Sequence, residues 1–281
     1  MPLIPSEKWR QCIAVVELAD NNKNTRNQPF MKSNFFYVIY ILWLRQIKRY
    51  FRSRARMIGS LGQPILFLVA LGYGLGPTFA KAGGGNYIQF LAPGVIAMGI
   101  LFTAVFSGIE VIWDRQFGFL KETLVAPVGR FSVMLGRTLG GATVACLQGV
   151  IVLIISLFIG FHPAFNSIPL AILFMLGIAT VFTALGTGIA SVLEDMQGFQ
   201  LIMNFVVMPT FFLSGALFPL EGVIGMIARF NPLTYGVDGL RATFIGVSTM
   251  PGGIWIDGGV LLAVSLVFLG IGAWLFSKIK I

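Results

Sequence analysis

Few side chains in this sequence could carry out chemistry. The chain of 281 residues has one histidine and two cysteines, and only 11% of its residues are charged. His162 stands alone, and Cys12 and Cys146 lie far apart, so neither a metal site nor a disulfide is predicted. No G-x-x-x-x-G-K-[ST] phosphate-binding loop and no Ser/His/Asp set occurs. The sequence therefore predicts a chain that is not an enzyme and that holds no cofactor of its own.

One loop combines charges of both signs with aromatic side chains. It reads WDRQFGFLKETLVAPVGR over residues 113–130. Phe117, Leu120 and Leu124 would share one face of a short helix, which Pro127 would end. With a lysine and a glutamate beside that apolar face, the helix is suited to docking into a groove of a soluble partner. A loop that only caps two neighbouring helices is the alternative.

A second charged segment reads FFYVIYILWLRQIKRYFRSRAR over residues 35–56. The side chains that share one helical face are Tyr40, Trp43, Leu44, Ile47, Phe51 and Ala55. The basic side chains on the other face are Arg45, Lys48, Arg49, Arg52 and Arg56. This pattern predicts an amphipathic helix in the plane of a membrane surface, and a basic flank that merely fixes topology is the alternative. Nucleic-acid binding is not predicted, because the aromatic face is better used in lipid.

Another polar cluster lies at residues 221–241. Asn231 is suited to cap a helix that starts at Pro232. Asp238 and Arg241 are three residues apart on that helix and are expected to pair, either as a structural ion pair or as part of a gate. Glu221 would open a preceding short helix, where a carboxylate is favourable at the positive helix terminus.

The overall composition points to the bilayer as the solvent for these elements. Residues of the AVILMFWYC set make up 56% of the chain even before its 34 glycines are counted. Soluble domains average roughly 45–50% apolar residues with glycine included. A soluble fold of this size cannot bury so much apolar surface. An integral membrane protein is therefore predicted.

Uncharged runs define the membrane spans. The run 138–193 is long enough for two spans and divides at the turn around 160–163. Gly136 and Gly140 are expected to permit close helix packing. The centres of the spans lack ionisable residues, so no proton or sodium relay is evident, and Asp257 is expected at the outer end of the last span. The six predicted spans are 57–75, 87–112, 131–159, 168–193, 200–218 and 257–276.

Basic residues set the predicted orientation. Of the 20 Lys and Arg, 17 fall on one side if the N-terminus is cytoplasmic. The positive-inside rule then places both termini in the cytoplasm, and no cleavable signal peptide is apparent. The predicted organisation is a cytoplasmic tail at 1–34, an amphipathic interfacial helix at 35–56 and a six-span domain at 57–281.

The segment at 113–130 resembles the coupling-helix signature of ABC-type-2 transporter permeases, the family of bacterial drug-resistance and lipo-oligosaccharide exporters. The stretches FLSGALFPL at 212–220 and NPLTYGVDGLR at 231–241 are similar to the family pattern after the fifth span. The six-span layout and the preceding interfacial helix also match. The resemblance covers roughly residues 35–276 and leaves the N-terminal tail outside.

The resemblance implies a dimeric permease, formed with an identical or paralogous protomer. It implies a partner ABC ATPase subunit that holds ATP and Mg, and a place in the bacterial cytoplasmic (inner) membrane. Residues matching 117–125 would form the coupling helix that contacts the ATPase, and the interfacial helix would also touch it. The segment 219–245 would form short re-entrant helices. The residues singled out are Phe117, Phe119, Leu120, Lys121, Glu122 and Leu124 for coupling, Trp43, Arg45, Lys48, Arg49 and Arg52 on the interfacial helix, and Glu221, Asp238 and Arg241 in the outer region.

The sequence thus predicts an all-α integral membrane protein with six transmembrane helices. Its predicted function is ATP-driven export of an amphipathic, lipid-like or lipid-linked substrate. An ion-coupled secondary transporter and a non-transporting subunit that recruits cytosolic proteins are the alternatives. The sequence does not identify the substrate.

Overall fold

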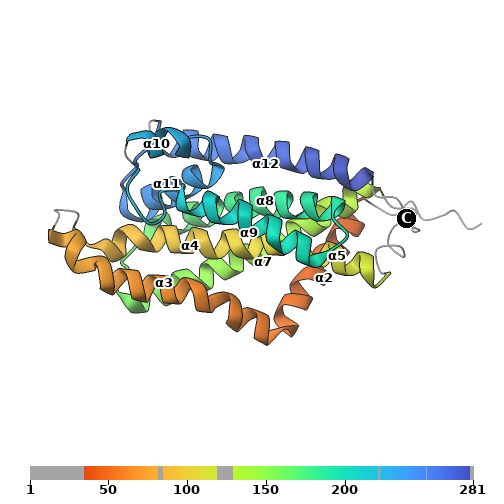
Figure 1. Ribbon diagram of the computed structural model, residues 1–281, viewed down its shortest axis with the longest axis horizontal. Helices are drawn as coiled ribbons and strands as arrows, with labels where there is room; N and C mark the ends of the chain where they lie inside the picture. The colour runs from red at the N-terminus through yellow and green to blue at the C-terminus, as the bar shows by residue number, and fades with distance from the viewer. Residues whose placement is uncertain (1–34, 82–84, 119–128, 221, 251, 279–281) are drawn as a thin grey trace, which may run out of the picture. The chain divides into compact units, whose positions relative to one another are not determined.

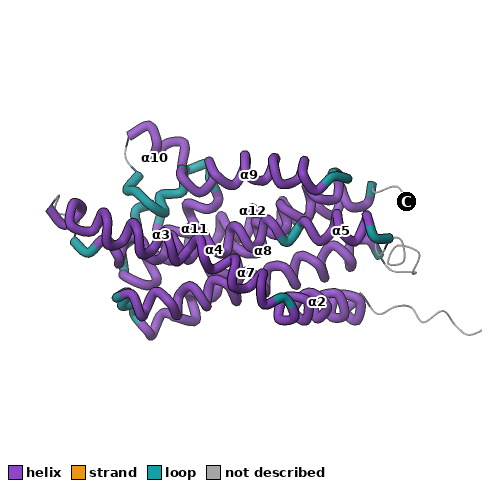
Figure 2. Tube along the Cα trace, turned by 60° about the horizontal axis from the view of Figure 1, so that its bottom comes forward, coloured by secondary structure: helices purple, strands orange, loops and turns teal. Residues whose placement is uncertain are grey.

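A computed structural model describes most of the chain after residue 34. Contacts divide the chain into two units, residues 1–34 and 35–281, and the first unit lies outside the described residues. Every regular element in the described part is helical (Figure 2). Within the second unit the structure describes all residues except 82–84, 119–128, 221, 251 and 279–281.

Five helical segments are long and apolar enough to cross a membrane. Uninterrupted runs of apolar residues, without charges at their centres, are the reason they form. Their bounds match predicted spans one to four and six within a few residues, except that the first two helical segments extend further at their C-terminal ends than predicted. The helices are α3 (Arg54–Lys81), α4 (Tyr87–Phe106) continued by α5 (Ile109–Gln116), α7 (Arg130–Ile159), α8 (Ile168–Val192) and α12 (Gly253–Ser277).

The fifth predicted span, 200–218, differs from the structure. The corresponding helix α9 (Met196–Phe212) is apolar but has only 17 residues and starts and ends earlier than predicted. Asp195 fixes its start, because its carboxylate accepts a hydrogen bond from the amide of Gly198 at 2.7 Å. Its end is followed by turns, in which Gly215 adopts a φ of 74°. The uncharged run was therefore a poor guide to the bounds of this helix.

Helix α8 lies at the centre of the helical unit and packs against α4, α7 and α12, while α3 packs beside α4 (Figure 1). Two short helices follow α9, namely α10 (Gly222–Ala228) and α11 (Pro232–Ile245). They lie at the opposite end of the helical unit from α5 and from the C-terminal end of α12 (Figure 1). The unit thus has two distinct ends, one marked by α5 and the other by α10 and α11.

Close helix crossings depend on glycine. A Cβ on Gly108, between α4 and α5, would lie 2.4 Å from the backbone oxygen of Gly186 in α8. A Cβ on Gly186 would in turn lie 2.3 Å from the backbone oxygen of Val105. Such distances are far below van der Waals contact, so only glycine at both positions lets these helices approach so closely.

Helix α2 (Phe35–Arg52) packs along α7. A Cβ on Gly136 would lie 2.9 Å from the Cβ of Leu42, and one on Gly140 would lie 2.7 Å from the Cβ of Gln46. These contacts confirm the prediction of close packing at the two glycines. The buried face of α2 is formed by Leu42, Gln46 and Tyr50. The prediction of two faces was therefore incomplete, because a third face packs against protein.

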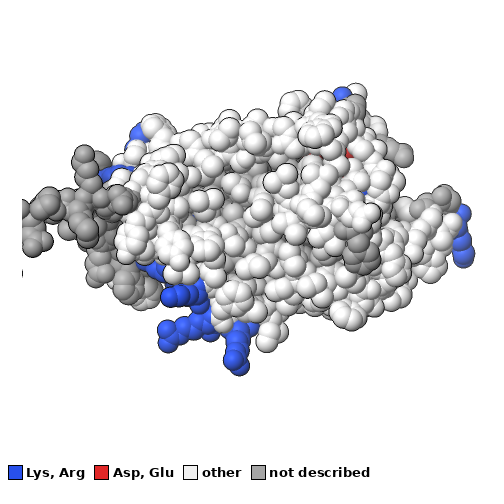
Figure 3. Space-filling model, turned by 180° about the vertical axis from the view of Figure 1, so that it is seen from behind, with Lys and Arg blue, Asp and Glu red and all other residues white. Residues whose placement is uncertain are grey.

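Large apolar side chains remain exposed along the outer faces of α3, α9 and α12. Examples are Leu66, Phe205 and Leu262, with exposed fractions of 68%, 80% and 63%. Figure 3 shows that the middle of the face seen from behind is free of lysine and arginine, which gather toward the ends. These apolar faces suit contact with lipid or with another membrane helix.

Candidate functional site

Charged side chains from three helices meet at the end of the helical unit marked by α5. Asp114 is at their centre: its Oδ2 accepts hydrogen bonds from Arg45 and, at 2.6 Å, from Nη2 of Arg137. Nη1 of Arg49 lies 3.7 Å from Oδ1 of Asp114 and 3.7 Å from Oε2 of Glu110. We call these five residues the charged junction. It joins α2, α5 and α7.

Residue spacing explains how the junction forms. Arg45 and Arg49 are four residues apart on α2, and Glu110 and Asp114 are four residues apart on α5. Side chains at this spacing share one helical face, so a basic pair faces an acidic pair. Arg137 adds the third helix. The junction therefore ties the interfacial helix to the two helices that flank residues 119–128.

The junction is largely removed from water. The exposed fractions of Glu110, Asp114 and Arg137 are 6%, 3% and 2%. An ion pair this deeply buried is costly to break, because removal of one partner leaves an uncompensated charge. From the sequence, Arg137 was predicted only as one of the basic residues on the cytoplasmic side, and its buried role in the junction was not predicted. The acidic pair on α5, in a chain so poor in carboxylates, was the signal available in the sequence.

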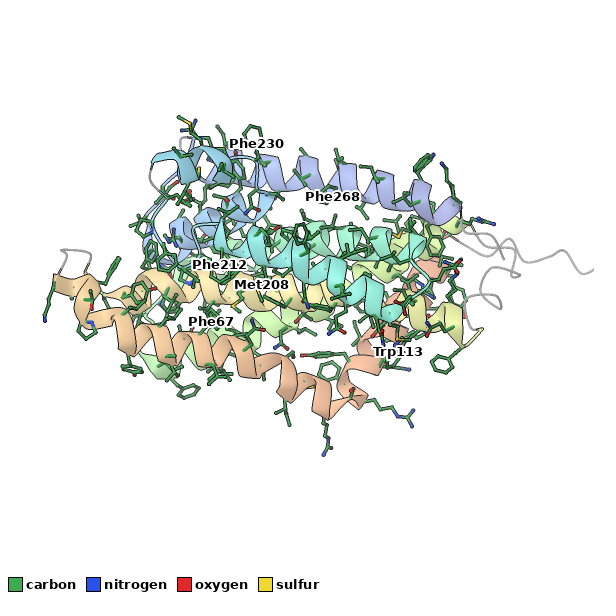
Figure 4. All side chains as sticks on the ribbon, in the orientation of Figure 1. Phe67, Trp113, Met208, Phe212, Phe230 and Phe268 are labelled. Carbon is green, nitrogen blue, oxygen red and sulfur yellow. The ribbon has the colours of Figure 1, made fainter. Side chains whose placement is uncertain are left out.

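Lys48 and Arg52 lie outside the junction but beside it. Together with Trp113 and Phe117 they line a hollow of about 410 Å³. The guanidinium of Arg49 lies 5.6 Å from the ring centroid of Trp113, the residue labelled in Figure 4, within the range of a cation–π contact. The predicted basic face of α2 is therefore divided between buried ion pairs and a basic, aromatic hollow.

Hydrogen bonds hold α2 further against α7. The indole of Trp43 donates to Oγ1 of Thr143 at 3.0 Å. The hydroxyl of Tyr50 donates to Oε1 of Gln148 at 2.7 Å. Burial raises the pKa of Tyr50 above its ordinary value of 10.0, which favours the protonated hydroxyl that donates this bond. Trp43 thus faces the neighbouring helix with its polar edge.

Among the predicted coupling residues, the structure places Phe117 at the end of α5, with 70% of its side chain exposed. Arg115, two residues earlier on α5, pairs with Glu194 at 2.7 Å and so links α5 to the loop before α9. The other predicted coupling residues are Phe119, Leu120, Lys121, Glu122 and Leu124, all of which lie outside the described residues.

At the opposite end, the structure corrects the predicted pairing of Asp238 with Arg241. Both residues are buried on α11, but no ion pair joins them within the part of the chain that the structure describes. Nη2 of Arg241 donates instead to the backbone oxygen of Gly215 at 2.9 Å. Its guanidinium lies 3.9 Å from the ring centroid of Phe90. Arg241 therefore holds the turn after α9.

Asp238 holds a different loop. It accepts hydrogen bonds from the hydroxyl of Ser248, from the amide and hydroxyl of Thr249 and from the amide of Met250. Burial alone would raise the pKa of Asp238, but these bonds favour the charged form and lower the pKa below 3.8. The hydrogen-bond donors of the loop at 248–250 thus take the place at the Asp238 carboxylate that was predicted for Arg241. Glu221 lies outside the described residues.

Two further findings concern this end of the molecule. The side chain of Asn231 accepts a hydrogen bond from the amide of Leu233 at 3.0 Å, which confirms the predicted cap of a helix starting at Pro232. Asp257 was predicted to open the last span at the outer interface; it lies near the start of α12, and its side chain is fully buried there. Neither of its carboxylate oxygens has a hydrogen-bond partner in the described chain.

Comparison with known proteins identifies the family. A family model described as "ABC-2 type transporter" matches residues 37–245. Nodulation protein J of Rhizobium leguminosarum bv. trifolii is 28% identical over 213 residues, covering 74% of this chain and 78% of that protein. The putative transport permease ycf38 of Porphyra purpurea is 30% identical over 198 residues, covering 68% of each chain. The inner membrane transport permease YadH of Escherichia coli K12 is 24% identical over 225 residues, covering 77% and 86%. The chain therefore belongs to the ABC-2 type transporter family, and its relatives are transport permeases.

Proposed function

We propose that this chain is the membrane-spanning subunit of an ATP-driven exporter in a bacterial inner membrane, with six spans and both termini in the cytoplasm. Helix α9 would be the fifth span in chain order and would bring the total to six: its 17 residues are at the lower limit for a membrane helix, about 17–25 residues. It runs between the α5 end and the α11 end (Figure 1). The asymmetric distribution of basic residues supports the orientation, and α10 and α11 would be the re-entrant helices.

The charged junction is the observation that carries this proposal. Residues 119–128 connect α5 to α7, and the junction fastens both helices to α2 through the carboxylate of Asp114. A force applied to this connection would therefore move three helices together. That is the requirement for a permease driven by a separate motor, and it agrees with the absence of a phosphate-binding loop in this chain.

The partners in this proposal follow from the same features. An ABC ATPase subunit holding ATP and Mg would bind the coupling segment and the basic hollow beside Trp113. A second protomer, identical or paralogous, would cover part of the exposed apolar face of α9, whose Phe205 is 80% exposed. The substrate would be amphipathic, since the centres of the spans offer no charge to a small ion.

The test is complex formation and ATPase stimulation with the cognate ATPase in proteoliposomes. We expect the triple variant Lys121→Glu, Glu122→Lys, Leu124→Asp to lose both, because it reverses the charges and removes an apolar contact of the docking segment. Lys81→Glu is the matched control, since Lys81 ends α3 at the opposite end of the helical unit from α5 (Figure 1). If the triple variant binds and stimulates the ATPase as the parent does, the docking assignment is wrong.

One observation favours a second candidate, ion-coupled transport. The buried carboxylate of Asp257, without a hydrogen-bond partner in the described residues, is the kind of group that a proton-coupled carrier uses. Transport of a fluorescent short-chain lipid in ATP-free liposomes, driven by a proton gradient alone, would refute the ATP-driven proposal. Absence of transport despite ATPase binding would instead identify a recruitment subunit.

A further inference from the structure

A cavity of about 350 Å³ lies among α2, α3, α4, α5 and α7, and Glu110 of the charged junction forms part of its lining. It brings amide and hydroxyl side chains together next to the buried charges of the junction. One wall is formed by Phe102 and Phe106, whose rings are stacked with centroids 6.3 Å apart. The polar side chains that line the cavity include Gln46, Tyr50, Gln63, Thr103, Ser107 and Glu110.

Gln46 provides independent evidence for a ligand. It is only 7% exposed, and its Cβ and Cγ atoms pack against Gly140, which has no side chain. No hydrogen bond of its amide is found among the described residues, and the amide is not one of the enclosed polar groups of the interior but opens onto the cavity that the side chain lines. Where a ligand excludes water from the cavity, an amide left without a partner costs about 1–3 kcal/mol. A ligand with polar groups would supply those bonds.

The lining also indicates the charge of that ligand. The one carboxylate in the lining, Glu110, already lies 3.7 Å from the guanidinium of Arg49. A cationic ligand group would have to compete with Arg49 for Glu110. An anionic group would be repelled by Glu110, and no lysine or arginine in the lining would offset that repulsion. Amides and hydroxyls offer both donors and acceptors. The lining therefore suits an uncharged group that has both, with an apolar side that can lie on the phenylalanine rings.

We propose that this cavity binds the uncharged, hydroxyl- or amide-bearing headgroup of an amphiphile within a single protomer. Its volume is at the small end of ligand pockets, about 300–1,000 Å³, so the headgroup fits and a long chain must stay outside. Helix α3 provides the place for that chain, because Ile58 and Leu66 flank the cavity-lining residues and are 72% and 68% exposed. The assignment of this ligand as transport cargo rests on the proposed export function.

The test measures equilibrium binding to the full-length permease in nanodiscs, without ATPase. The probes are radiolabelled n-octyl-β-D-glucoside, n-octyl sulfate and n-octyltrimethylammonium, which share one chain and differ in headgroup charge. The variant is Gln46→Leu with Gln63→Leu, which keeps side-chain volume but removes the amides. Gln200→Leu is the matched control, since this glutamine is exposed on α9, away from the cavity. Far-UV circular dichroism and size exclusion check that each variant is folded.

We expect the glucoside to bind at least about tenfold more tightly than the two charged probes, the scale of one or two buried hydrogen bonds. The double variant should lose about tenfold in glucoside affinity, while Gln200→Leu should bind as the parent does. Equal binding of the three probes, or unchanged glucoside affinity of a folded double variant, would overturn the proposal. Because no ATPase is present, loss of coupling in the experiment above would refute the exporter function and leave this site standing.

Discussion

Asp114→Asn is the sharpest perturbation of the charged junction. The substitution keeps the shape of the side chain but removes the negative charge on which Arg45 and Arg137 converge. Arg137 is 2% exposed, so water cannot replace the lost partner. Breaking a buried ion pair by removing one partner costs about 3–5 kcal/mol. We expect Asp114→Asn to lower the free energy of unfolding by that amount, measured by denaturant titration in mixed micelles with tryptophan fluorescence.

A surface ion pair of the same kind provides the control. Arg115 and Glu194 are 2.7 Å apart, but the side chain of Glu194 is 78% exposed. Glu194→Gln should therefore cost less than about 1 kcal/mol. Adding Arg137→Met to Asp114→Asn should recover part of the lost stability, because the stranded charge is then removed. If Asp114→Asn costs no more than Glu194→Gln, the reasoning about the junction is wrong.

Two further predictions concern the helix crossing and the outer loop. Gly108→Ala should destabilise the fold strongly, because the added Cβ would lie 2.4 Å from the backbone of α8. Gly74→Ala should have little effect, since no atom lies within 4 Å of the Cβ that it would add. Thermal unfolding of both variants distinguishes the outcomes. Asp238→Ala should speed hydrogen exchange of the amides of Thr249 and Met250 about 10- to 100-fold, since bonds to a charged acceptor contribute about 1.5–3 kcal/mol. Because the pKa of Asp238 is lowered, this protection should persist in mild acid and fade only as the pH falls below the ordinary aspartate range; unchanged exchange in the variant would contradict the assignment.

Hydropathy predicted most of the helices because each depends on a local property of the chain. An uncharged run of about 20 residues is sufficient for a membrane helix wherever it lies. The turn at 160–163 was also predictable, and Gly160 indeed adopts a φ of 109° at the end of α7. The bounds of α9 were harder to predict. The cap at Asp195 sets its start, and the turns after Phe212 end the helix within the apolar run.

The candidate site was predictable in part. The sequence drew attention to α2, because charge and aromatic residues alternate around it with helical spacing. It did not indicate that Arg45 and Arg49 would meet the carboxylate of Asp114, which is more than 60 residues away in the chain. Nor did it distinguish the buried Arg137 from an ordinary flanking cation. Spacing along one helix shows which residues share a face but not what that face contacts.

The outer region shows the same limit. Asp238 and Arg241 have the spacing of an ion pair, yet each binds backbone or side-chain groups of a different loop. An ion pair within one helix contributes little, whereas loop amides and carbonyls buried without partners would cost more. The geometry of the loops therefore determines which partners these two residues take.

The sequence by itself determined the solvent, the helical class and the positions of nearly all the spans. These follow from composition and from runs of apolar residues, which act over short stretches of chain. The tertiary structure alone decided which charges are buried, which polar side chains line the cavity and that Gly108 and Gly186 mark a helix crossing. Those properties depend on contacts between distant segments, where the cost of burying a charge or an amide is set by the neighbours that packing supplies.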